Sequence, residues 1–125
     1  MRRKLIYAAI VVFCVVLASI SSFAQESSFN ETKEKAEHGN ANEQNRLGIA
    51  YYAGIGVEQN YAEAFKWFCQ AAEQGNANAQ FNLGLSYYAG NGVEQNYAMA
   101  FKWLRKAAEQ GNKKAQERLR KLGQN

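Results

Sequence analysis

The sequence predicts an all-α protein, a right-handed α-α superhelix with two full helix-turn-helix repeats between a leading helix and a capping helix. Three observations predict this solenoid. A 36-residue stretch occurs twice with 25 identical positions, apolar residues recur at helical spacing, and the 125-residue chain has no proline. Repeats of about 20–50 residues bury their apolar faces only against neighbouring copies, so we expect one continuous stack.

Residues 1–24 have the pattern of a secretory signal peptide. Three basic residues follow the first methionine, an apolar run comes next, and Ser22 and Ala24 provide the small residues that precede a cleavage site. We therefore expect residues 25–125 to form an exported domain, either periplasmic or secreted. An uncleaved membrane anchor is the alternative, because about 20 apolar residues span a bilayer.

Each repeat is expected to contain two helices joined by a turn, in residues 36–71 and 72–107. In the second repeat Gly90 ends the first helix as a left-handed cap, and Asn96 begins the second helix as an N-cap. Residues at helical spacing form two packing faces: Leu83, Gly84 and Tyr87 in the first helix, and Tyr97, Ala100, Phe101, Leu104, Ala107 and Ala108 in the second.

The two ends of the chain are expected to close the stack. Residues 28–38 can form a leading helix, and residues 112–123 repeat the start of the first-helix pattern. In this last segment Arg120 replaces the packing glycine, as expected for the polar terminal cap of a solenoid.

Composition excludes several classes of function. The chain has 15 basic residues, 11 glutamates, no aspartate and one histidine, and removal of residues 1–24 leaves 12 basic residues against those 11 glutamates. A charge near +1 argues against nucleic-acid binding. Most catalytic constellations cannot be assembled from this inventory, so we expect no catalytic residue, no cofactor and no metal site.

Two features leave alternatives open. Cys69 is the only cysteine after residue 24, and because it aligns with Arg105 we expect it to face solvent. In an oxidising compartment it is either an idle thiol or an intermolecular disulfide that links a homodimer. The basic C-terminal end is either a solvated cap or a docking surface for an acidic protein or an anionic lipid.

The repeat resembles the Sel-one-like repeat family, a relative of the tetratricopeptide repeat. The residues that carry the resemblance are Ala79-Gln80, Leu83-Gly84, Tyr87, Gly90, Gly92-Val93, Ala100, Trp103, Ala107-Ala108 and Gly111. It covers about residues 36–123. Asn60 and Asn96 stand where the family usually has aspartate, a change that preserves helix capping.

The resemblance implies an exported, non-catalytic adaptor that mediates protein–protein interaction and does not stay in a membrane after signal cleavage. Some exported members of the family are described as penicillin-binding or β-lactamase-like, which is the alternative function. The chain has no serine-x-x-lysine motif to support that chemistry.

The family resemblance also implies that the first helix of each pair lines the concave side of the stack. On a helical wheel the face opposite the packing residues carries a mixture of amide, basic and aliphatic side chains. These residues are Asn42, Arg46 and Ile49 in the first repeat and Asn78, Asn82 and Leu85 in the second. We expect them to form a groove for a protein or peptide partner, with simple solvent exposure as the alternative.

Overall fold

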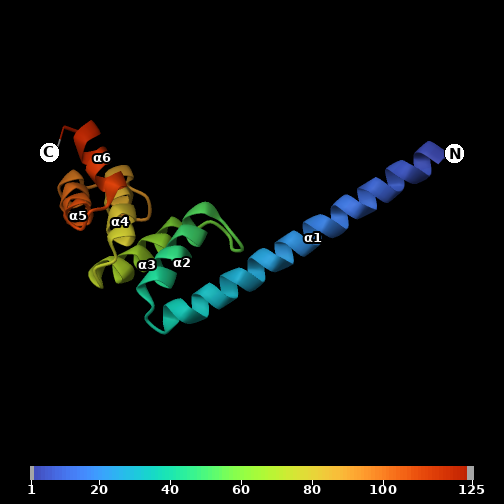
Figure 1. Ribbon diagram of the computed structural model, residues 1–125, viewed down its shortest axis with the longest axis horizontal. Helices are drawn as coiled ribbons and strands as arrows, with labels where there is room; N and C mark the ends of the chain where they lie inside the picture. The colour runs from blue at the N-terminus through green and yellow to red at the C-terminus, as the bar shows by residue number, and fades with distance from the viewer. Residues whose placement is uncertain (1, 124–125) are drawn as a thin grey trace.

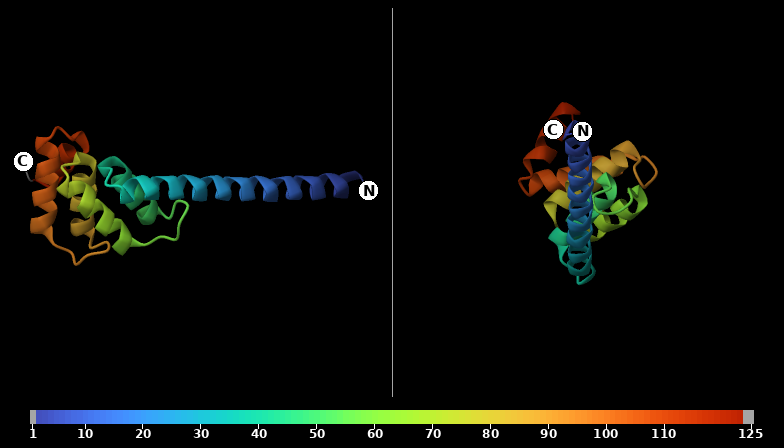
Figure 2. Two further views of the ribbon diagram at one scale, coloured as in Figure 1. Left: turned by 90° about the horizontal axis from the view of Figure 1, so that it is seen from below. Right: turned by 90° about the vertical axis from the view of Figure 1, so that its right-hand side faces the viewer.

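A computed structural model describes residues 2–123, which form six helices and no strand (Figure 1). The helices are α1 (Arg2–Glu37), α2 (Ala41–Ala53), α3 (Tyr61–Glu73), α4 (Ala77–Ala89), α5 (Tyr97–Glu109) and α6 (Lys113–Lys121). Helices α2 and α3 form one antiparallel pair and α4 and α5 the next, while α6 closes the stack (Figures 1 and 2). The predicted all-α solenoid is confirmed.

Helix α1 is much longer than the leading helix that the sequence predicts. No glycine or proline interrupts residues 2–38, so the apolar segment and the leading helix join into one continuous helix. Its N-terminal half projects from the stack with its apolar side chains exposed (Figures 1 and 2). By length and composition α1 can cross a membrane.

The last thirteen residues of α1 occupy the place of a second repeat helix. Phe29 meets Tyr51 edge-to-face with ring centroids 5.5 Å apart, and Phe65, 36 residues later, meets Tyr87 in the same way at 5.3 Å. The leading segment is therefore a half-repeat that covers α2 as α3 covers α4. Its sequence match to α3 is weak, which is why the 36-residue alignment begins after Phe29.

Turn glycines make the same contact in both repeats. A Cβ atom on Gly56 would lie 2.6 Å from the backbone oxygen of Gln25, and a Cβ atom on Gly92 would overlap the backbone of Tyr61. Gln25 and Tyr61 are 36 residues apart, so each turn packs on the start of the preceding second helix. Both glycines also have positive φ, a conformation that other residues rarely adopt.

Five asparagines cap the helices of the stack, as the predicted N-caps require. Each side-chain oxygen accepts a hydrogen bond from the backbone N–H three residues later, at 2.9–3.0 Å. The five are Asn40, Asn60, Asn76, Asn96 and Asn112. Gly90 ends α4 in the left-handed conformation with φ 75°, which confirms the predicted C-cap.

Leucine and alanine fill the core, and glycine lets paired helices approach closely. Leu83 and Leu104 are almost completely buried. A Cβ atom on Gly84 would lie 2.8 Å from Cγ of Leu104, so this glycine sets the distance between α4 and α5. The predicted burial of Tyr97 is wrong: the residue is 52% exposed, because at the first position of α5 its ring lies against Tyr88, with centroids 5.1 Å apart, rather than in the core.

Candidate functional site

A periodic set of hydrogen bonds fixes the angle between successive repeats. The side-chain amides of Gln44, Gln80 and Gln116 donate to the carbonyls of Ala36, Ala72 and Ala108, at 3.0–3.2 Å. Gln44 and Gln80 in turn accept hydrogen bonds from the side chains of Gln74 and Gln110, at 2.6 and 2.7 Å. Because the amides of Gln44 and Gln80 are buried and hydrogen-bonded, the face that the first helices present has a fixed shape.

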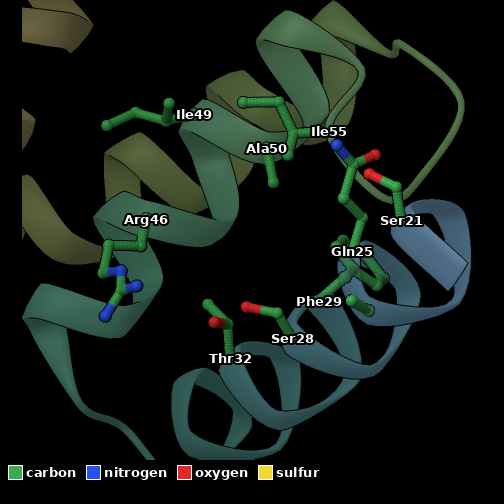
Figure 3. Close-up of a pocket in the computed structure, with 10 residues that line it drawn as sticks. Ser21, Gln25, Ser28, Phe29, Thr32, Arg46, Ile49, Ala50 and Ile55 are labelled. Atoms are coloured by element: carbon green, nitrogen blue, oxygen red, sulfur yellow. The ribbon is translucent and has the colours of Figure 1, made fainter. Parts of the chain in front are cut away.

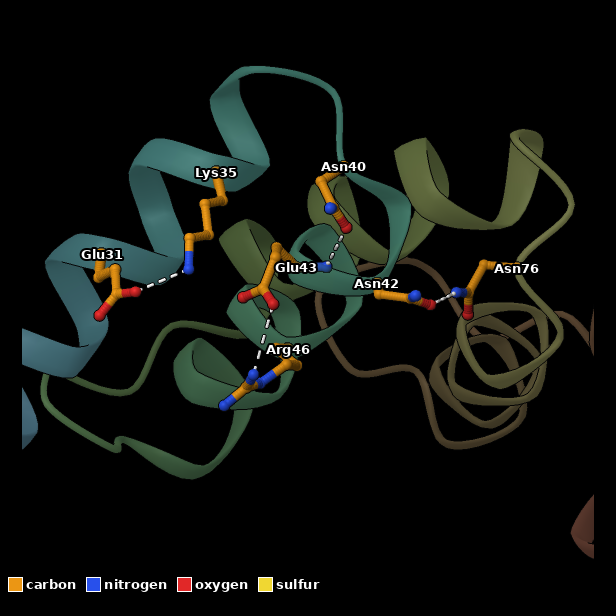
Figure 4. Close-up of polar contacts among 7 residues, drawn as sticks. All are labelled: Glu31, Lys35, Asn40, Asn42, Glu43, Arg46 and Asn76. Atoms are coloured by element: carbon orange, nitrogen blue, oxygen red, sulfur yellow. Dashed lines mark hydrogen bonds and ion pairs between the residues drawn. The ribbon is translucent and has the colours of Figure 1, made fainter.

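Three of the predicted groove residues join this network between repeats. Asn76 donates to Asn42 at 2.7 Å (Figure 4), and Asn112 donates to Asn78 at 3.0 Å. Asn82 donates to Asn45 at 2.9 Å and is half-buried. These asparagines therefore hold neighbouring helices together as well as lining a surface.

The first of three hollows on this face lies between α1 and α2 and has a volume of about 520 Å³ (Figure 3). Its floor and rim include Phe29, Ile49 and Ile55, which give it a mainly apolar surface. Hydroxyl groups of α1 face it, and Arg46 lies at its edge (Figure 3). The Arg46 guanidinium contacts the carboxylate of Glu43 at 3.4 Å (Figure 4).

The second hollow lies between α2 and α4 and has a volume of about 290 Å³. Its lining combines apolar side chains with polar groups that are already hydrogen-bonded: Ile49, Tyr52, Phe68, Asn82, Leu85 and Ser86. Ile49 also lines the first hollow, so the two hollows are neighbours on this face. This arrangement provides apolar contact area with a few fixed polar groups, which is typical of a binding site.

The third hollow lies between α4 and α6 and has a volume of about 270 Å³. Its lining is Phe81, Lys114, Glu117, Arg118 and Lys121. Arg118 and Lys121 stand 36 residues after Asn82 and Leu85, so this hollow continues the same face. The basic C-terminal end was expected to be either a solvated cap or a docking surface, but it was not expected to lie on the groove face, although the 36-residue spacing indicates this.

The structure therefore divides the six predicted groove residues. Ile49, Asn82 and Leu85 come together in the second hollow, and Arg46 lies with Ile49 at the first. Asn42 and Asn78 lie outside the hollows, on the rim where helices begin. We refer to the three hollows along this face together as the groove.

Cys69 does not face solvent as predicted. It is half-buried beside Tyr87 against the core. The cysteine side chain is short and stays against the core, whereas the longer side chain of Arg105, at the aligned position, is exposed. Burial raises the pKa of the thiol to about 11, and the nearby Glu73 carboxylate adds to this effect. The thiol is therefore protonated at neutral pH and a weak nucleophile. An intermolecular disulfide through Cys69 stays a prediction.

The titratable residues of the stack do not gather into a reactive centre. His38 lies exposed at the end of α1, with Nδ1 2.7 Å from the carbonyl oxygen of Glu34. Within residues 2–123 no three histidine, cysteine or glutamate side chains are grouped to hold a metal ion.

Comparison with known proteins agrees with this architecture. A family model of the Sel1 repeat matches residues 44–76 and 77–112. The chain belongs to the Sel1 repeat family. This confirms the resemblance seen in the sequence, and the helical stack of this family is typically used for protein–protein interaction. No curated protein sequence matches the chain.

Solved structures of Sel1 repeat proteins are similar to this one. A protective antigen of uropathogenic Escherichia coli with an SLR fold is 41% identical with TM-score 0.71, over 72% of this chain and 19% of that one. A Sel1 repeat protein from Oxalobacter formigenes is 40% identical with TM-score 0.74, over 78% and 28%. Cysteine rich protein B of Helicobacter pylori is 28% identical with TM-score 0.66, over 70% and 65%. This Sel1 repeat chain therefore spans less than two thirds of each.

Proposed function

We propose that this Sel1 repeat protein is an exported, non-catalytic module that binds a segment of another protein in its groove. The main evidence for this proposal is the second hollow. Ile49 is 41% exposed and Tyr52 is 40% exposed, on a face whose backbone is fixed by hydrogen bonds between repeats. Exposed apolar side chains on a rigid concave surface gain free energy when a partner covers them.

The N-terminal segment supports export. Residues 2–24 are exposed along their whole length and have the signal-peptide pattern. Cleavage after Ala24 would leave Gln25–Glu37, which has the same length as α3 and makes the half-repeat contacts. The cut would therefore remove the apolar segment, together with Ser21 and Ala24 from one wall of the first hollow, and leave the half-repeat and the helix pairs in place. We propose the periplasm or the exterior of the cell as its location.

A β-lactamase-like activity is the alternative, and no contact in the groove favours it. Acyl transfer needs a nucleophile with an adjacent base and donors for the oxyanion. Ser86 is buried, and its hydroxyl donates to the carbonyl of Asn82 at 3.0 Å. Turnover of nitrocefin by the purified protein would favour the enzyme over the binding module.

The proposal is tested with two aspartate substitutions at exposed sites. Ile49→Asp places a carboxylate between the first two hollows, and Tyr97→Asp places one at the start of α5, outside the groove. Tagged full-length chains are used to capture partners from the envelope fraction in mild detergent, and melting temperatures are recorded in parallel. We expect Ile49→Asp to lose the captured protein and Tyr97→Asp to retain it, with both melting near the wild type. Capture that survives Ile49→Asp would contradict the groove assignment.

A further inference from the structure

We propose that the groove selects an extended peptide whose apolar residues lie on α2 and α4 and whose acidic residue lies on α6. This inference rests on the proposed function and adds the chemistry of the partner. It follows from the way three equivalent positions change from one first helix to the next. The three sets are Asn42, Asn78 and Lys114, then Arg46, Asn82 and Arg118, then Ile49, Leu85 and Lys121.

The positive charge at the α6 end is not neutralised by the protein. Glu117 is the one carboxylate lining the third hollow, and Lys121 already holds it at 3.0 Å. Across residues 2–123 no carboxylate lies within 4 Å of the charged groups of Lys114 or Arg118. Both side chains are exposed, so a ligand carboxylate can reach them without displacing a protein partner.

The middle of the groove requires a different chemistry. Around the second hollow Ile49 and Tyr52 are exposed and Leu85 is half-buried, and the amide of Asn82 already donates to Asn45. This region offers apolar contact and no unpaired cation. A ligand that fits the whole groove is therefore apolar over α2 and α4 and negative over α6.

The arrangement of the stack favours a peptide over a lipid surface. Helix α6 lies at the end of the stack opposite to the projecting apolar half of α1 (Figures 1 and 2). A bilayer that holds α1 before cleavage would therefore be far from the basic residues. The cations also line a hollow with Phe81 rather than an open convex face.

Helix spacing gives the length of the peptide motif. Helices that pack through side chains lie about 10 Å apart, which corresponds to about three residues of extended peptide at 3.3 Å each. The peptide would place one apolar residue over the first hollow, one over the second and an acidic residue over the third. The expected motif is therefore apolar-x-x-apolar-x-x-acidic.

Selection of random peptides tests this inference and the proposed function separately. The full-length chain, kept soluble in mild detergent, is used to select peptides from a displayed random library. We expect enriched peptides to carry an acid about three residues from an apolar residue. Failure to enrich any peptide would overturn the proposed function. Enrichment of apolar peptides without an acidic preference would leave that function standing and overturn the present inference.

Charge exchange then assigns the acid to α6. Two labelled peptides are used, one with glutamate at the acidic position and one with lysine there. The affinity of each peptide is measured for the wild-type protein and for the Arg118→Glu variant. We expect the substitution to weaken the glutamate peptide about tenfold at low salt and less at high salt, and to strengthen the lysine peptide. Lys102→Glu, on the exposed face of α5, serves as a matched control and should change neither affinity.

Two results would overturn the assignment. One is an affinity for the glutamate peptide that Arg118→Glu does not change. The other is Arg118-dependent binding to detergent micelles that contain phosphatidylglycerol, without any acidic preference among peptides, which would indicate a lipid-binding end.

Discussion

Replacement of Gly84 by alanine tests the close packing on which the stack depends. The new Cβ would lie 2.8 Å from Cγ of Leu104 and 3.1 Å from the carbonyl oxygen of Ala100. The second contact is with backbone, so α4 and α5 must move apart. Such overpacking costs about 1–3 kcal/mol, whereas alanine in place of glycine stabilises a helix interior by about 1 kcal/mol. The two effects together give a net loss of up to about 2 kcal/mol from the free energy of unfolding.

Urea unfolding followed by circular dichroism measures this loss. Lys102→Gly and Lys102→Ala, compared at an exposed position in the middle of α5, give the helix-propensity difference without a steric contact. Leu104→Ala removes the nearer contact, so Gly84→Ala should cost less in that background, with a coupling energy of about 1 kcal/mol. If Gly84→Ala stabilises the protein as much as alanine does at position 102, the packing argument is refuted.

Three further predictions concern the first helix, the network between repeats and the cysteine. Deletion of residues 2–24 should leave the melting temperature of the stack unchanged, whereas Phe29→Ala should cost about 1–3 kcal/mol in urea unfolding because Tyr51 loses its cover. Gln80→Leu should cost about 1–3 kcal/mol by the same measurement, since the buried carbonyl of Ala72 loses its side-chain donor. Alkylation of Cys69, followed by mass spectrometry in a Cys14→Ser chain, should accelerate about tenfold per pH unit from about pH 8 to about pH 10, because its raised pKa keeps the thiolate scarce there. Alkylation that levels off near pH 9, the behaviour of an ordinary thiol, would contradict burial of the sulfur.

The sequence predicts the features that repeat locally. Period, helix pairing and caps all follow from residues within one 36-residue unit, so Asn96 and Gly90 lie where the pattern indicates. The half-repeat in α1 is different. Apart from Phe29 it shares little with α3 beyond its last two residues, and it becomes visible only when Phe29 is seen on Tyr51.

The groove was predicted less completely than the fold. A helical wheel shows which residues of one helix lie away from its core face, and it correctly places Ile49 and Leu85 on a shared surface. It contains no information on how successive repeats meet. The hydrogen bonds from Asn76 to Asn42 and from Asn82 to Asn45 depend on the angle between successive repeats. The half-burial of Cys69 depends on the same angle.

Site-specific photo-crosslinking in living cells tests the central claim that this protein acts through the shape of its concave face. A photoreactive amino acid is placed at position 49 in one chain and at position 97 in another. We expect position 49 to crosslink to a partner protein and position 97 to give none. Crosslinks from position 97 alone would show that the partner binds outside the groove, and the assignment of the groove would be wrong.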